Sequence, residues 1–199
     1  MNIYNNMDPN LQSVSDNNGI LEFTLNNVNV SIANALRRII MSDIPSYVFR
    51  TAPYNNNNAT IEKNTTRFNN EILKQRLSCI PIHIEDPKFP FDTYQIEVEK
   101  KNNSNEIQYI TTEDFKIKNT LNNEFLSKEQ QNKIFPPNKI TKHYIEFARL
   151  RPSISEEIQG EELKFVCKIS KAKPSDDCMF NVVSTCSYGN TPDSSKAEE

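Results

Sequence analysis

The chain has 199 residues, which is enough for one sizeable core or two small ones. Hydrophobic residues make up 36% and charged residues 25%, so the composition is polar but outside the disordered range. The formal net charge of −3 gives the chain no general attraction to nucleic acid, which disfavours stand-alone DNA or RNA binding. The chain contains only 3 glycines, which excludes a glycine-rich phosphate-binding loop.

The cysteines and the hydropathy exclude further classes of protein. The chain has 4 cysteines, namely Cys79, Cys167, Cys178 and Cys186. No two of them have the C-x-x-C spacing of a zinc site. The N-terminus lacks the basic and apolar regions of a signal peptide, and no apolar run approaches the roughly 18 residues of a membrane span. We therefore expect an intracellular protein with reduced thiols and with no cofactor of its own.

The first residues predict a flexible end followed by a strand. Residues 1–18 are polar and rich in asparagine, and we expect them to be mobile. Residues 19–30 alternate in polarity, with Leu21, Phe23 and Leu25 on one side, as in a half-buried strand.

A helix with two different faces is predicted next. Asn29 or Ser31 is its N-cap, and Pro45 ends it near Asp43, because the residue before a proline avoids the helical region. A helical wheel of about 100° per residue separates the side chains into two groups. The apolar stripe consists of Ile32, Ala35, Leu36, Ile39 and Ile40. The opposite, polar face consists of Asn34, Arg37, Arg38 and Met41.

The two faces of this helix indicate two different contacts. An apolar stripe of this width buries against a sheet or another helix, and we interpret it as the core or dimer face. A polar face is often simply solvated, but Met41 gains nothing from solvent. Asp43 is the only acidic residue in this segment that Arg37 and Arg38 could pair with. Arginine and methionine are both enriched at protein interfaces, so we interpret the polar face as a partner-binding surface.

The rest of the chain is rich in short strands. Five further strands are predicted at residues 46–51, 59–66, 143–152, 161–170 and 179–189. Residues 92–101 and 106–117 flank a polar turn and predict a hairpin. A short helix is predicted at residues 70–79 with Asn69 as its cap, and residues 118–138 are expected to be a loop. Strands without a βαβ rhythm predict an α+β protein with mostly antiparallel sheet.

Two blocks of the sequence resemble a known family. Residues 30–49, VSIANALRRIIMSDIPSYVF, resemble the signature helix of the RNA polymerase assembly subunits. These are the bacterial alpha subunit and the third-largest subunit of eukaryotic RNA polymerase II with its archaeal counterpart. Residues 61–82, IEKNTTRFNNEILKQRLSCIPI, resemble the second block of the family, N-[ST]-[ST] followed by an acidic residue and by R-L-x-x-I-P-[IL]. Residues 148–163 match more weakly, and residues 179–193 resemble members from large DNA viruses of eukaryotes.

The resemblance implies a fold in two parts. A dimerisation domain contributes its first strand and helix, a β-rich insert interrupts it, and the chain then returns to complete it. The implied parts are a flexible N-terminus at 1–18, the first part of the dimerisation domain at 19–48, the insert at 49–190, and a tail or truncated return at 191–199. We expect the apolar stripe to lack its usual cover from the same chain. Some members carry a zinc loop in the insert, but the stretch after residues 80–87 has no cysteine here, so no metal is expected.

The resemblance also implies a function and partners. The chain would be a non-catalytic assembly subunit of a DNA-directed RNA polymerase, in a nucleus or, for a virus, in a cytoplasmic viral factory or virion. It would pair with a smaller alpha-like subunit, separate or fused, and then recruit the second-largest and largest subunits, with DNA contacted only through the complex. The polar face around Arg37 and Arg38 would contact the second-largest subunit. Glu71 and Arg76 would help to fix the insert near that interface. Glu71 could instead be only a charge at a helix N-terminus, and for Arg76 we expect a partner contact or a buried ion pair in preference to a solvated side chain.

Two other interpretations stay open at this point. Cys79, His83 and Asp86 lie close in sequence and could serve a thiol enzyme. Cys79 lies in an apolar run before a proline, however, which indicates a buried and inert thiol. A generic β-rich interaction module is the other alternative; it would fold alone as a monomer, whereas an assembly subunit would be unstable without its partner.

Overall fold

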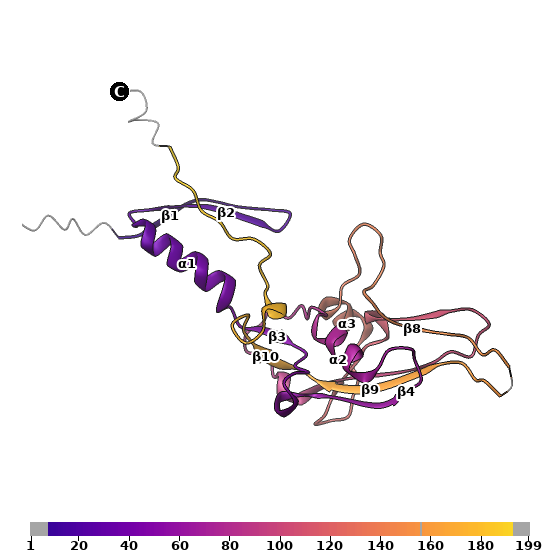
Figure 1. Ribbon diagram of the computed structural model, residues 1–199. Helices are drawn as coiled ribbons and strands as arrows, with labels where there is room; N and C mark the ends of the chain where they lie inside the picture. Colours follow the sequence, from indigo (N-terminus) through magenta and orange to yellow (C-terminus); the bar gives the residue numbers. More distant parts are fainter. Residues whose placement is uncertain (1–7, 156, 193–199) are drawn as a thin grey trace, which may run out of the picture. The chain divides into compact units, whose positions relative to one another are not determined.

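The structure is a computed structural model that describes residues 8–155 and 157–192 (Figure 1). The chain forms two compact units. The first contains the chain up to Ile44 and again from Asn181 onward, and the second contains Pro45–Phe180. The second unit is therefore inserted into the first, with boundaries at 44/45 and 180/181 where the sequence suggested 48/49 and 190/191.

The first unit begins with a β-hairpin. Strand β1 (Asn10–Asn17) pairs antiparallel with β2 (Ile20–Asn26). Asn18 and Gly19 form the turn with φ values of 53° and 81°. Asn-Gly is strongly preferred in such two-residue turns because both positions need a positive φ. Residues 10–17, which the sequence suggested were part of a flexible end, thus form a strand, while residues 1–7 lie outside the described part.

Helix α1 (Val30–Ser42) completes the regular structure described in this unit and forms as predicted. The Asn29 side chain accepts a hydrogen bond of 2.9 Å from the backbone N–H of Ile32, which satisfies one of the free amides of the first turn. Asp43 is the C-cap, two residues before Pro45. The local signals for this helix were therefore sufficient to place both of its ends.

The second unit contains three antiparallel sheets. Strand β3 (Ser46–Val48) pairs with β10 (Ser170–Ala172). The largest sheet has the order β4-β9-β5-β7. Its strands are β4 (Ala59–Asn64), β9 (Glu162–Lys168), β5 (Tyr94–Lys101) and β7 (Lys116–Asn119). Strand β6 (Gln108–Thr111) pairs with β8 (Glu146–Leu150). All strand pairs in the described residues are antiparallel, which agrees with the predicted α+β class.

Two α-helices lie in the described part of the second unit. Helix α2 (Asn70–Ser78) forms as predicted, and the Asn69 side chain caps it by accepting a 2.9 Å hydrogen bond from the Ile72 N–H. Helix α3 (Lys128–Ile134) lies where a loop was expected. Ser127 and Gln130 form a reciprocal capping box at its N-terminus, a sequence signal that the high polarity of this stretch obscured.

The predicted hairpin of residues 92–101 with 106–117 is wrong. Strand β5 pairs with β7 and β9, whereas β6 pairs with β8. A short 3₁₀ helix at Thr112–Asp114 turns the chain after β6, so that Ile117 returns to lie opposite Ile96, with both side chains buried. The strand expected at 179–189 is also absent from the described structure, where a 3₁₀ helix, Cys178–Phe180, precedes irregular chain.

The core of the second unit is built around the ring of Phe115, which is completely buried. Four other phenylalanine rings lie 5.6–6.5 Å from it in edge-to-face geometry, namely Phe49, Phe135, Phe147 and Phe165. Such aromatic pairs contribute about 0.5–1.5 kcal/mol each beyond their buried area. These rings come from the ends of β3 and α3 and from β8 and β9, so one cluster joins the separate sheets.

Gly160 tests the packing between the β8–β9 connection and the end of β5. A Cβ atom at this position would lie 1.8 Å from the backbone oxygen of Asn102. We expect Gly160→Ala to lower the free energy of unfolding by about 1–3 kcal/mol, because the backbone must move apart. Gly189→Ala is the matched control, since nothing lies within 4 Å of its added Cβ. Equal denaturation midpoints for both variants would show that this close approach is not part of the folded protein.

Candidate subunit interface

The apolar stripe of α1 is largely open. The side chains of Ile32, Leu36 and Ile39 are 46%, 40% and 52% exposed. Ala35 is also exposed, and Ile40 is half-buried. Isoleucine and leucine are among the residues most often fully buried, so a row of them along one helix is an unusual surface. Residues 8–155 and 157–192 leave the stripe open to this extent.

The polar face of α1 is partly covered, which a simply solvated face would not be. Asn34, Arg37 and Met41 are half-buried, whereas Arg38 is exposed. The Nε of Arg37 donates a 3.1 Å hydrogen bond to Oδ1 of Asn34. Asn34 therefore orients the Arg37 guanidinium one turn along the helix, and Arg38 is the arginine with the more accessible side chain.

The hairpin adds further exposed apolar side chains to the first unit. They are Leu11, Val14, Ile20, Leu21 and Phe23. None of the described residues in this unit falls in the buried class, so α1 and the hairpin have no closed core between them. A two-stranded hairpin on its own is at best marginally stable in water, so the described part of this unit gains little stability from β1 and β2 alone.

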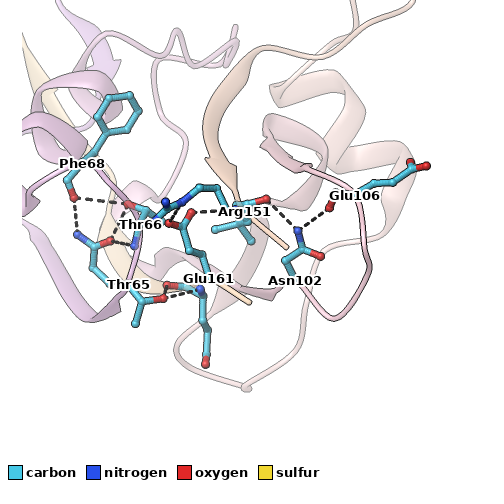
Figure 2. Close-up of polar contacts among 10 residues, drawn as sticks. Thr65, Thr66, Phe68, Asn102, Glu106, Arg151 and Glu161 are labelled. Atoms are coloured by element: carbon cyan, nitrogen blue, oxygen red, sulfur yellow. Dashed lines mark hydrogen bonds and ion pairs between the residues drawn. The ribbon is translucent and has the colours of Figure 1, made fainter. Parts of the chain in front are cut away.

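The second sequence block forms the turn between β4 and α2 (Figure 2). The Asn64 side chain donates to the Phe68 carbonyl at 2.8 Å and accepts from the N–H and hydroxyl of Thr66 at 2.9 and 2.7 Å. The Thr65 hydroxyl accepts a 2.7 Å hydrogen bond from the N–H of Glu162 in β9. The N-[ST]-[ST] pattern is therefore explained by its role in holding the start of α2 against the sheet.

Arg76 joins α2 to strand β8. Its Nε donates to the Phe147 carbonyl at 2.7 Å, and its Nη2 donates to the Glu146 carbonyl at 3.1 Å. The guanidinium carbon also lies 5.4 Å from the centre of the Phe68 ring. The alternative of a buried ion pair is wrong, because backbone carbonyls take the place of a carboxylate. This side chain positions α2, and its two hydrogen bonds to β8 could not be read from the sequence.

Glu71 and Cys79 mark the two ends of α2. Glu71 is exposed in the first turn, where the helix amides favour a carboxylate. Cys79 is the C-cap and is exposed, so the expectation of a buried thiol at this position is wrong. Its N–H still bonds back to the Arg76 carbonyl, which turns the chain before Pro81 and leaves the side chain at the surface.

Among the described residues, no hydrogen bond joins the side chains of Cys79, His83 and Asp86, the three residues that suggested a thiol site. A carboxylate oxygen of Asp86 accepts a 2.8 Å hydrogen bond from the Lys88 N–H. The buried thiol is Cys167, whose pKa is raised to about 12 by burial, so it is protonated and unreactive at neutral pH. Residues 8–155 and 157–192 contain no group of three or more His, Cys, Asp or Glu side chains placed to hold a metal ion. In the same residues, no helix is long and apolar enough to span a bilayer.

A buried polar network in the second unit was not predicted from the sequence (Figure 2). The amide of Asn102 is completely buried and donates to the carbonyls of Glu106 and Leu150 at 2.8 and 2.9 Å. Arg151 forms an ion pair with Glu161, whose side chain is only 8% exposed. The available sequence signal was a pair of opposite charges, Arg151 and Glu161, at the facing ends of two predicted strands.

The two units together define a class of protein. One unit is interrupted, presents an open apolar helix and hairpin, and lacks a core; the other is a self-contained β-rich insert. An open, interrupted unit joined to a closed insert is typical of a subunit of a larger assembly. The family model of the RNA polymerase Rpb3/Rpb11 dimerisation domain matches residues 22–194. The chain therefore belongs to this family, the alpha-like and Rpb3-like subunits of the DNA-directed RNA polymerases of transcription.

Curated relatives agree with this assignment. The chain is 25% identical over 197 residues to the DNA-directed RNA polymerases I and III subunit RPAC1 of Homo sapiens, and 26% identical to that of Bos taurus. These matches cover 87% of this chain and 51% of each relative, so the chain spans about half of their length. Subunit 3B of the DNA-directed RNA polymerases IV and V of Arabidopsis thaliana is 38% identical over 64 residues, which is 32% of this chain and 18% of that protein. The resemblance of the tail to viral members stays a prediction.

Substitution of Arg76 tests the hydrogen-bonded contact between α2 and β8. We expect Arg76→Ala to lower the free energy of unfolding by about 1–3 kcal/mol, because two carbonyls of β8 lose their donors. Arg67→Ala is the control, since Arg67 is exposed and makes no hydrogen bond or ion pair to the described residues. Urea denaturation followed by circular dichroism measures both variants. Equal stabilities would show that the Arg76 contacts contribute nothing.

Proposed function

We propose that this chain is the larger, non-catalytic assembly subunit of a multisubunit DNA-directed RNA polymerase. It pairs with a smaller alpha-like subunit, separate or fused, through the apolar stripe of α1. The observation that carries this proposal is the open stripe itself, in which Ile32, Leu36 and Ile39 are each at least 40% exposed. Membership in a dimerisation-domain family supports the assignment of a second subunit as the missing cover.

The energetics require the hairpin to take part in the pairing. Fully burying a leucine or isoleucine contributes about 1.5–3 kcal/mol, so three half-exposed side chains contribute about 2–5 kcal/mol. The loss of translational and rotational freedom on association costs about 4–15 kcal/mol. The stripe alone does not offset this cost. The exposed side chains of β1 and β2 must therefore be covered in the same event, which makes the interface continuous over the first unit.

The paired subunits then recruit the second-largest subunit through the polar face of α1, and the largest subunit follows. Arg38 is exposed and Arg37 is oriented by Asn34, with Met41 beside them on the same face. The planar fork of a guanidinium can hold carboxylates or carbonyls with two hydrogen bonds. Glu71 is a second candidate contact because it is exposed, whereas Arg76 acts by positioning α2.

Catalysis in this proposal belongs to the large subunits. The chain contributes neither a cofactor nor a reacting group, and it meets DNA only through the complex. The assembly works where its template lies, which is a nucleus or, for a viral chain, a cytoplasmic viral factory or virion. The alternative of a generic β-rich interaction module accounts for the closed core of the second unit but leaves the open first unit without a role.

Leu36 tests the pairing. We expect Leu36→Asp to abolish co-purification with the smaller alpha-like subunit, because pairing would bury an unpaired charge. Ile140→Asp is the control, since it places the same charge at a position that is 90% exposed in the second unit. Circular dichroism of both variants confirms that the second unit stays folded. Normal recovery of the smaller subunit with the Leu36 variant would refute the proposal.

Arg37 and Arg38 test the recruitment step. We expect the double variant Arg37→Ala/Arg38→Ala to pair normally with the smaller subunit but to bind the second-largest subunit more weakly by over about 1 kcal/mol. The control, Lys128→Ala/Lys139→Ala, removes two exposed cations from the second unit and leaves α1 intact. Biolayer interferometry of the preformed heterodimer gives the dissociation constants. An unchanged constant for the arginine variant would remove the polar face from the interface.

A further inference from the structure

The turn of the first hairpin contains the one Asn-Gly pair in the sequence, Asn18-Gly19. Both residues are exposed, and both have a positive φ, 53° and 81°. Asparagine is a thermolabile residue, because the backbone nitrogen of the residue that follows it can attack its side-chain carbonyl carbon. This attack is easiest before glycine, which has no Cβ to hinder it. The hairpin turn therefore carries the most reactive type of asparagine pair.

Neither reacting group in this turn is held by a hydrogen bond. The Asn18 side chain and the Gly19 N–H make none within residues 8–155 and 157–192. The strands close the turn through the pair Asn17 and Ile20 on either side of it. A Cβ built on Gly19 would meet nothing within 4 Å, so the space beside the glycine is open to a new ring. The attacked carbon and the attacking nitrogen are thus both accessible.

Other asparagines of the chain are more restrained. Several side-chain oxygens accept a hydrogen bond from the backbone N–H two residues further along, among them those of Asn57, Asn64, Asn102, Asn119, Asn138 and Asn181. Asn103 is the best comparison with Asn18, because it is exposed and a small residue, Ser104, follows it. The Ser104 N–H donates to Oδ1 of Asn102 at 2.9 Å, so the nitrogen that would attack Asn103 is held. Asn18 is therefore distinguished by its freedom as well as by its glycine.

The first unit allows this turn to open. Attack requires the Asn18 side chain to lie over the Gly19 nitrogen, so the turn must open locally before a ring can close. None of the described residues in this unit falls in the buried class, and local opening is frequent where buried contacts are few. A hairpin of two strands is also only marginally stable by itself. The reactive arrangement is therefore accessible from the folded chain.

We propose that Asn18 is a site of spontaneous modification by water, and that the product weakens the hairpin of β1 and β2. Solvent base removes the proton from the Gly19 nitrogen, which then bonds to the side-chain carbonyl carbon of Asn18. The bond from that carbon to the side-chain nitrogen breaks, and this nitrogen leaves with a proton as ammonia. Water next opens the resulting cyclic imide at one of its two carbonyl carbons. The reaction needs this chain and water alone, so it is independent of the proposed function.

The position at which water opens the imide decides the effect on the hairpin. Opening at the side-chain carbonyl gives aspartate on an unaltered main chain. Opening at the main-chain carbonyl gives isoaspartate, which routes the main chain through the former side chain and adds a methylene group to it. A two-residue turn matches the twist of its strands only with defined backbone angles, so the longer main chain separates Asn17 from Ile20. The isoaspartate form therefore loses the register of β1 with β2.

Peptide mapping by mass spectrometry tests the modification. The purified full chain is incubated in buffer near neutral pH, and the conversion of amide to acid is followed at Asn18 and at Asn103. We expect Asn18 to convert at least about tenfold faster, because Ser104 must first break a hydrogen bond and carries a Cβ. The control Asn18→Gly keeps a turn that Gly-Gly also suits, and it should form no acid at this position. An Asn18 that stays intact, or that converts no faster than Asn103, would overturn the proposal.

Hydrogen exchange measures the effect on the hairpin. The isoaspartate form is isolated by chromatography and compared with the freshly purified variant Asn18→Asp, which carries the same charge on an unaltered main chain. We expect the amides of residues 10–26 to exchange several-fold faster in the isoaspartate form, and the aspartate variant to behave like the original chain, because Asp-Gly also suits this turn. Equal exchange in the two forms would show that the added methylene does not break the turn, which would overturn the second half of the proposal.

Discussion

One helix and a two-stranded hairpin cannot enclose a core, and these are the regular elements described in the first unit. Its apolar side chains stay at the surface because residues 8–44 and 181–192 supply no second layer to bury them against. In the proposed pairing, the stability of this unit would be coupled to the concentration of the smaller subunit, as in obligate dimers. The second unit has no such dependence, since five phenylalanine rings close its core from within. The chain thus combines a unit with a closed core and a unit whose described apolar side chains remain open.

Local signals predicted the helices well but not the sheet. Asn29 and Asn69 each sit at the N-cap of a helix, and Pro45 follows the end of α1, so three residues were enough to place these boundaries. The pairing of β5 with β7 was missed because it depends on the turn at Thr112–Asp114 and on burial of distant side chains. The first hairpin was missed for a different reason: the Asn18-Gly19 turn signal was present, but the polar composition around it suggested disorder.

The candidate site was predictable only where it depends on periodicity. The spacing of Ile32, Leu36 and Ile39 defines the open stripe, because helical geometry alone brings them to one face. The acceptors of Arg76 lie 70 and 71 residues further along the chain, and no local pattern indicates them. The same holds for the contact between Asn102 and Gly160, which appears only when the two loops meet in the folded unit.

The two hydrogen bonds from Arg76 to β8 also bear on how readily the insert pairs with strands of other chains. Strand β8 has a neighbour in its sheet on one side only, so its other edge offers backbone groups to any passing strand. The guanidinium donates to the carbonyls of Glu146 and Phe147, so these two acceptors are not available to a passing strand. While the first unit is uncovered, its exposed apolar side chains favour self-association. Engaged carbonyls in β8 of the other unit remove one route to it.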